Sequence, residues 1–228
     1  MKKIFFLSAL TFCMLPVLAQ DATSLVQQVR SKLELVNDYQ ANGKMKTNVI
    51  FIKAPVANVK VYYKRPDKMR IVNETGVSFI PKGAVNINLN NIFSGNAGFD
   101  VIDAGKGTHG SRMVKLLPRD EGSDIVLSTL VIDERNLLIL KSTTTTKENG
   151  TYELEMFYGK YSTYGLPDKI VFSFNSKDFK LPKGVTLDYD DGTKKKNGDS
   201  LKNKKGKVEI NYSNYIINKG ISDNIFKS

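Results

Sequence analysis

The chain has 228 residues, of which 41% are hydrophobic and 25% charged, and its formal net charge at pH 7 is +11. This length suffices for one domain with its own core, and the single cysteine excludes a fold held together by disulfides. Much of the excess charge is local, because seven lysines and one acid lie between Lys194 and Lys207. A charge excess confined to one hydrophilic stretch argues against a nucleic-acid partner.

The N-terminus has the pattern of a secretory signal. Two lysines precede an apolar run over residues 4–18, and the small Ala19 follows it. The run is shorter than the about 20 apolar residues that a membrane-spanning helix needs. We therefore expect residues 1–19 to be a signal peptide that is cleaved before Gln20. Cys13 lies inside this segment, so the mature chain is expected to carry no thiol and to work outside the cytoplasm.

The next segment predicts an amphipathic helix over residues 23–39. Its apolar side chains recur at three- and four-residue spacing, as one face of a helix requires. Asp21 or Thr23 can cap the first turn, and Gly43 is expected to end the helix. The apolar positions are Leu25, Val26, Val29, Leu33, Val36 and Tyr39.

Beyond Gly43 the spacing of apolar residues changes to two, which indicates strands. The gaps between these segments are mostly too short for the crossover helices of a parallel sheet, so we expect antiparallel pairing. One further short helix is expected at residues 86–93. The predicted strands span residues 45–53, 57–64, 68–73, 77–80, 99–103, 112–117, 125–132, 137–145, 151–160, 168–175 and 207–217.

Several predicted strands have one apolar face. In residues 57–64, for example, Val59, Val61 and Tyr63 alternate with polar or charged neighbours. A long sheet with one apolar face must curl or be covered. The predicted fold is therefore mainly β with α: an open, curved antiparallel half-barrel of about eleven strands, covered by the N-terminal helix and a short lid helix. Residues 20–228 are expected to form this one domain, with residues 186–207 as a lysine-rich hairpin insertion.

Three short patterns could belong to catalytic or ligand sites. Residues 198–201 spell a hydrolase nucleophile motif around Ser200, but a base and an orienting acid are not apparent. Residues 105–110 match a dinucleotide fingerprint, yet the helix and parallel strand that it requires do not follow, so a hairpin connection is expected. The acids at 188–191 could hold calcium, or they could be solvated turn residues. We expect a protein that binds rather than catalyses, with no metal or cofactor; lone His109 cannot form a metal site without companions.

Three segments carry a resemblance to a known family. VYYKRPDKMRI (61–71), SRMVKLLPRDEGSDIVLSTLVID (111–133) and VEINYSNYIINKGISDNIF (208–226) are similar to the strand-turn-strand, Leu-Pro and C-terminal signatures of the outer-membrane lipoprotein-carrier (LolA-like) family. The resemblance implies an eleven-stranded half-barrel with a helical lid, whose apolar concave face holds lipid or lipoprotein acyl chains on their way across the periplasm. It also implies an inner-membrane donor and an outer-membrane acceptor. We expect a monomer. The segment 73–93 and the lysine-rich hairpin depart from the family pattern, so the resemblance does not identify the specific cargo.

Arg65 matches the family arginine that hydrogen-bonds the lid and keeps the empty cavity shut. Its predicted phase, shared with Val61 and Tyr63, points inward. The alternative is an arginine at a strand end whose charged group reaches water.

The candidate wall of the apolar cavity comes from the inward phase of four strands. The same residues could instead be an ordinary filled core, because alternation does not distinguish a hollow barrel from a full one. An envelope sensor or protein-interaction module on the same scaffold, using the lysine-rich hairpin, is the alternative function. The candidate wall residues are Val59, Val61, Tyr63, Met69, Ile71, Leu154, Met156, Phe172 and Phe174.

Overall fold

The computed structural model describes six parts of the chain, which contain most of the predicted elements. The predicted signal peptide, the strand at 77–80, the motif around Ser200, the acids at 188–191 and nearly all of the lysine-rich hairpin lie outside them. Of the predicted helix at 86–93, only Phe93 is described, and it is helical and buried. The described residues are 21–49, 52–53, 56–74, 93, 98–175 and 205–227.

The N-terminal helix, α1 (Ala22–Leu33), is shorter than predicted. Asp21 is its N-cap, and its buried face carries the predicted apolar residues up to Leu33. The prediction that it continues to residue 39 was wrong, because strand pairing begins at Asp38 and overrides the helical spacing of the apolar residues. The Asn218 side chain fixes the backbone of the segment between α1 and the first strand. Its Oδ1 accepts from the Asn37 N–H at 2.8 Å, and its Nδ2 donates to the Leu35 carbonyl at 2.8 Å.

The strands confirm the predicted antiparallel architecture. The predicted strand at 45–53 begins earlier and divides in two, and Gly43 lies inside its first part rather than ending the helix. The strands of the described residues are β1 (Asp38–Val49), β2 (Ile52–Lys53), β3 (Ala57–Lys64), β4 (Lys68–Asn73), β5 (Phe99–Lys106), β6 (Ser111–Pro118), β7 (Ile125–Asp133), β8 (Leu138–Thr146), β9 (Gly150–Phe157), β10 (Lys169–Asn175) and β11 (Lys205–Ile217).

All of these strands join one open antiparallel sheet. The spatial order is β4-β3-β1-β11-β10-β9-β8-β7-β6-β5, and β2 pairs with the end of β1. The first and last strands therefore lie side by side, with Tyr39 opposite Ile217 at one end and Asn48 opposite Lys207 at the other. Among the described strands, β4 and β5 lie at the two edges of this order and do not pair with each other, so the sheet is an open half-barrel.

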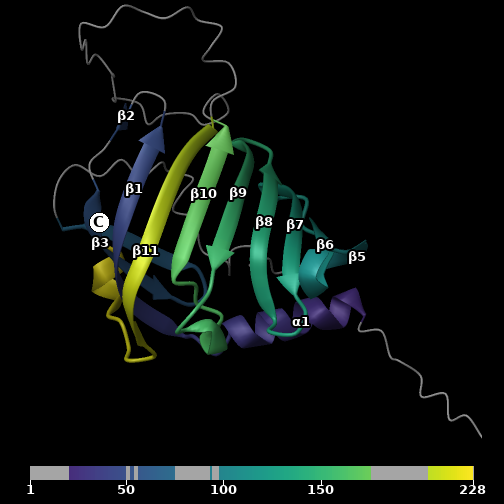
Figure 1. Cartoon of the computed structure of the whole chain (residues 1–228), viewed down its shortest axis with the longest axis horizontal. Coiled ribbons are helices and arrows are strands. Elements are labelled where there is room, and N and C mark those ends of the chain that lie inside the picture. Colours follow the sequence, from purple (N-terminus) through teal and green to yellow (C-terminus); the bar gives the residue numbers. More distant parts are fainter. Residues whose placement is uncertain are drawn as a thin grey trace, which may run out of the picture.

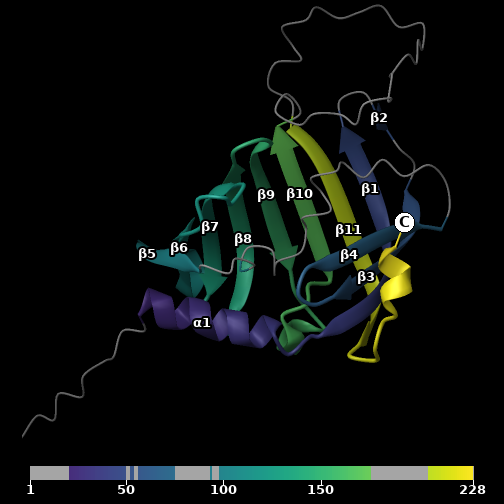
Figure 2. The ribbon, with the colours of Figure 1, turned by 180° about the vertical axis from the view of Figure 1, so that it is seen from behind.

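The sheet curls around one apolar core. Figures 1 and 2 show β3 and β4 crossing over one side of the concave face, while α1 lies across one end of the strands β7 to β9. The buried side chains of α1, β1, β3 and β6 to β11 form one continuous hydrophobic cluster. The predicted curved half-barrel with a helix across it is thus confirmed.

Charged residues occupy the outer face, opposite the apolar one, as the alternation predicts. Lys169 Nζ lies 3.0 Å from the Glu209 carboxylate, and Lys141 Nζ lies 3.5 Å from that of Glu153. Exposed pairs of this kind contribute about 0–1 kcal/mol each. The outer face of the sheet is therefore exposed to solvent, and its inner face forms the hydrophobic core.

Candidate ligand-binding face

The candidate site is the concave face of the sheet, and the structure places the predicted wall residues on it. Seven of them are buried, and Met69 and Ile71 on the edge strand β4 are half-buried and packed against the others. The buried seven are Val59, Val61, Tyr63, Leu154, Met156, Phe172 and Phe174.

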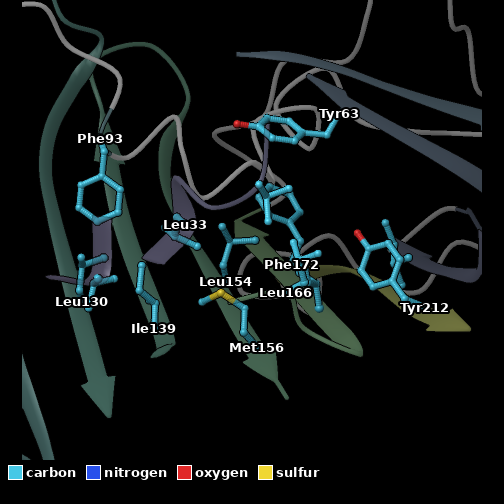
Figure 3. Packing of buried hydrophobic residues seen from close by; sticks show 14 of the residues in the cluster. Leu33, Tyr63, Phe93, Leu130, Ile139, Leu154, Met156, Leu166, Phe172 and Tyr212 are labelled. Carbon is cyan, nitrogen blue, oxygen red and sulfur yellow. The ribbon is translucent and has the colours of Figure 1, made fainter. Parts of the chain in front are cut away.

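Strand register divides these residues into two groups. On β3 and β4, Val61 is opposite Ile71 and Tyr63 is opposite Met69. On β9 and β10, Phe172 is opposite Leu154, and its ring centroid lies 5.2 Å from that of Phe174. Buried residues of β1 and β11 lie between the groups and join them into one cluster. Figure 3 shows Leu154, Met156 and Phe172 pointing into the same interior as Tyr63.

The helix α1 and Phe93 also contribute to this interior. Leu33 at the end of α1 and Phe93 lie with Leu130 and Ile139 over the β7–β8 part of the sheet (Figure 3). The alternation of β7 could have indicated Leu130, because that residue shares its phase with the buried Ile132. Ile139 is harder to predict, since a register irregularity near Val131 and Ile132 changes the phase of β8.

A cluster of tyrosine rings at one end of the face was missed by the sequence analysis. The Tyr215 ring centroid lies 4.9 Å from that of Tyr161, 5.1 Å from that of Tyr212 and 5.3 Å from that of Tyr39. Tyr39 in turn lies 5.2 Å from Tyr63. The signal was hidden because Tyr212 and Tyr215 are three residues apart on a strand, a spacing that should place them on opposite faces.

A register shift in the β1–β11 pair explains why both tyrosines face inward. Asn42 is opposite Asn214, but the next residue, Gly43, is opposite Tyr212, so β11 contains one extra residue at Ser213. Such a bulge inverts the phase of the strand beyond it. Tyr212 and Tyr215 are consequently both buried.

Three hydroxyl groups of this cluster have partners: Tyr215 Oη donates to the Pro167 carbonyl at 2.7 Å, Tyr161 Oη donates to Asn214 Oδ1 at 3.5 Å, and Tyr63 Oη donates to the Pro66 carbonyl at 3.5 Å. Outside the cluster, Tyr158 Oη donates to the Ile139 carbonyl at 2.8 Å. The Tyr212 hydroxyl is buried and has no hydrogen-bond partner among the described residues. Burial raises the pKa of Tyr212 and of Tyr158 above the ordinary value, so both phenols are neutral donors at physiological pH.

A second group of polar side chains lies on the concave face of β7 and β8. Ser128, Ser142 and Thr144 are fully buried. The Ser128 and Thr144 hydroxyl oxygens are 3.0 Å apart, and those of Ser142 and Thr144 are 3.4 Å apart. Because these hydroxyls satisfy one another, they can line an apolar interior without a large desolvation cost.

Arg65 differs in part from its prediction. It lies in the turn between β3 and β4, and its side chain is 38% exposed, so the predicted inward phase was wrong. Its guanidinium nevertheless reaches the end of α1: Nη1 donates to the Glu34 carbonyl at 3.0 Å, and Nη2 lies 3.7 Å from the Glu34 carboxylate. Arg65 thus joins the β3–β4 turn to the residue that caps α1.

The glycine-rich segment is a hairpin connection, as predicted. It joins β5 to β6, which pair antiparallel, and His109 is exposed there with a left-handed φ of 57°. Arg112 anchors the start of β6: its guanidinium binds Asp103 at 2.9 Å and Glu134 at 2.8 Å. In the described part of the chain, no three histidine, cysteine or acidic residues are grouped so as to hold a metal ion.

Among the described residues, no helix is both long enough and apolar enough to span a bilayer.

Comparison with solved structures assigns the fold. The chain is similar to an outer membrane lipoprotein-sorting protein domain from Vibrio parahaemolyticus, with a TM-score of 0.57 and 9% identity over 90% of this chain and 96% of that one. A LolA superfamily protein from Nitrosomonas europaea gives a TM-score of 0.57 and 11% identity over 92% and 99% of the two chains.

A DUF1329 family protein from Desulfovibrio piger gives a TM-score of 0.54 and 13% identity over 90% and 95% of the two chains. No protein-family model and no curated protein sequence matches the chain. At these identities the comparisons show a shared fold, and the fold of this chain is LolA-like.

Proposed function

We propose that the protein is a non-enzymatic periplasmic carrier that shields acyl chains of lipids or lipoproteins on its concave face. The observation that carries the proposal is the continuous apolar cluster that runs from β3 across β1 and β11 to β7, inside an open sheet with a helix across one end. The LolA-like fold supports it, because two similar structures are named as a lipoprotein-sorting domain and a LolA superfamily protein.

The chemistry of the face fits acyl chains. The wall is built from branched aliphatic, methionine and aromatic side chains such as Val61, Met156 and Phe172, and transfer of an acyl chain to such a wall releases about 25 cal/mol per Å² of apolar surface. Methionine side chains also adapt to acyl chains of variable shape. The expected wall residues and the part of Arg65 as a latch at the end of α1 belong to this proposal.

The site of action follows from the predicted signal peptide. A carrier of this kind receives its cargo at the inner membrane and delivers it at the outer membrane, as a monomer. The alternative, a sensor or protein-interaction module, would act through the lysine-rich hairpin and would not need a lipid on the concave face.

The test is co-purification. The signal-cleaved protein, prepared without detergent, is measured by native mass spectrometry and then extracted for lipid analysis. The carrier proposal expects an acyl-lipid adduct, and a variant that lacks residues 194–205 is expected to retain it. A clean mass that does not change on addition of phospholipid or lipopeptide would contradict the proposal and favour the interaction module.

A further inference from the structure

The Tyr212 hydroxyl is a buried polar group for which the described structure supplies no acceptor. The residue is only 9% exposed, and its ring belongs to the apolar cluster. A buried phenol without a partner is destabilising relative to a hydrogen-bonded one. Such a group calls for an explanation, and a ligand that pairs with the hydroxyl is one.

The surroundings of the hydroxyl are the site proposed for acyl chains. Figure 3 shows the Tyr212 hydroxyl on the side of its ring that faces Phe172 and Tyr63. The neighbouring position on β1 is Gly43, which places no side chain beside the ring. The tyrosine therefore offers a hydroxyl without a partner among the described residues at one end of a mainly apolar wall.

The neighbouring tyrosine is held differently, which makes Tyr212 distinct within the cluster. Tyr215 uses its hydroxyl in a 2.7 Å bond to the Pro167 carbonyl, so that group is committed to the fold. Tyr212 is tied to the sheet through its backbone, whose N–H donates to the Asp168 carbonyl at 2.8 Å. Its side-chain hydroxyl is the group that remains available, as far as the described residues go.

The burial of the tyrosine cluster favours an uncharged polar group on the ligand. Desolvation by burial is the main cause that raises the pKa of Tyr39, and the other contributions come from the phenols of Tyr212 and Tyr63. At Tyr215, burial is again the main cause that raises the pKa. A carboxylate placed beside Tyr212 would lose its hydration. Lys160 lies over the Tyr161 ring of the cluster, 5.1 Å from its centroid, and not over the Tyr212 ring. A neutral carbonyl needs only one donor, which the phenol supplies.

We propose that the Tyr212 hydroxyl donates a hydrogen bond to the uncharged ester or amide carbonyl of a bound acyl chain. The inference rests on the proposed carrier function and narrows its ligand to acyl esters or amides, as opposed to free fatty acids or plain hydrocarbons. Phospholipids and acylated lipoproteins both present such a carbonyl.

The test compares Tyr212→Phe with Tyr215→Phe in the signal-cleaved protein. Binding of methyl laurate, laurate and dodecane is measured by displacement of a fluorescent naphthylamine probe. For Tyr212→Phe we expect affinity for methyl laurate to fall about tenfold, which corresponds to one hydrogen bond of about 1.4 kcal/mol, while affinity for dodecane is unchanged. The wild type is expected to bind methyl laurate more tightly than laurate.

Thermal stability provides the second readout. Tyr212→Phe removes a buried polar group that lacks a partner in the described structure, so the Tm of the ligand-free protein is expected to rise by a few degrees. Tyr215→Phe breaks the bond to Pro167, so its Tm is expected to fall.

Two outcomes would overturn the role of Tyr212 without overturning the carrier function. The first is wild-type affinity of Tyr212→Phe for methyl laurate. The second is a Tm of Tyr212→Phe that falls as that of Tyr215→Phe does, because a buried water would then already pair with the Tyr212 hydroxyl. A wild type that binds neither methyl laurate nor dodecane would overturn the carrier function as well. A parallel titration with dilauroyl phosphatidylethanolamine and with a diacylated lipopeptide shows for which of these two ligands Tyr212→Phe weakens binding.

Discussion

Arg65 Nη1 donates a 3.0 Å hydrogen bond to the backbone carbonyl of Glu34, the residue that caps the C-terminal end of α1. The turn that carries Arg65 is held on the same connection by its backbone N–H, which donates to the Asn37 carbonyl at 2.8 Å. The last carbonyls of a helix need partners, and a cation at that end also interacts favourably with the helix dipole. Arg65 therefore couples the position of α1 to the β3–β4 hairpin.

Replacing Arg65 by glutamine should loosen α1. We expect the free energy of unfolding to fall by about 1 kcal/mol, because one charge-assisted but partly exposed hydrogen bond is lost. Amide hydrogen exchange should accelerate in α1 before it does in the sheet. Arg119→Gln is the control, since Arg119 pairs with Asp100 on an exposed hairpin. Equal exchange rates of α1 in wild type and Arg65→Gln would contradict the coupling.

Gly43 should not tolerate a side chain. An added Cβ would lie 2.8 Å from the Asn211 carbonyl oxygen, a backbone atom that moves only with the β1–β11 pair. Gly43→Ala is therefore expected to destabilise the protein by about 1–3 kcal/mol, as overpacking does. In the control, Gly122→Ala, the nearest atom is 3.2 Å away on the flexible Asp120 side chain, so denaturant titration should show a much smaller change.

Most of the sheet could be predicted from the sequence because strands such as β3 and β9 alternate regularly between buried and less buried residues. Val59, Val61 and Tyr63 have one phase throughout β3, so their shared burial follows directly from the period of two. The end of α1 could not be predicted, because Tyr39 also fits the helical spacing and only its pairing with Tyr63 and Ile217 places it in a strand.

The tyrosine end of the site could not be predicted for a related reason. Tyr215 is inward only because β11 contains an extra residue near Ser213, and the position of that bulge depends on the pairing with β1. The orientation of Arg65 also depends on a tertiary contact, since the residue lies in a turn where strand phase no longer applies.

The hydroxyl group of Thr144 should contribute to the stability of the fold. Thr144→Val leaves the buried Ser128 hydroxyl without its 3.0 Å partner, so we expect a loss of about 1–2 kcal/mol in the free energy of unfolding. Thr145→Val is the matched control on the same strand, because the Thr145 hydroxyl pairs with Thr151 in an exposed position. If both variants unfold at the same urea concentration, the buried network contributes nothing.

Alkaline pH should destabilise the protein through the tyrosine cluster. Burial holds the pKa of Tyr39, Tyr212 and Tyr215 above the usual value of 10.0, so the folded state keeps these protons while the unfolded state loses them. The stability that depends on the neutral phenols is present below pH 10 and decreases as the pH rises further. Phenolate absorbance should show a late group of tyrosines that ionises together with unfolding; ionisation of all tyrosines in one step near pH 10 would contradict this burial.

The measurement that tests the acyl-chain site most directly is methyl NMR of the methionines with a spin-labelled acyl ester. Met45 and Met156 are 2% and 4% exposed on the concave side, whereas Met113 is 36% exposed on the outer side of β6. A chain bound on the concave face should broaden the Met45 and Met156 methyl signals strongly and that of Met113 weakly. Broadening confined to Met113, or none at saturating ester, would contradict the carrier account.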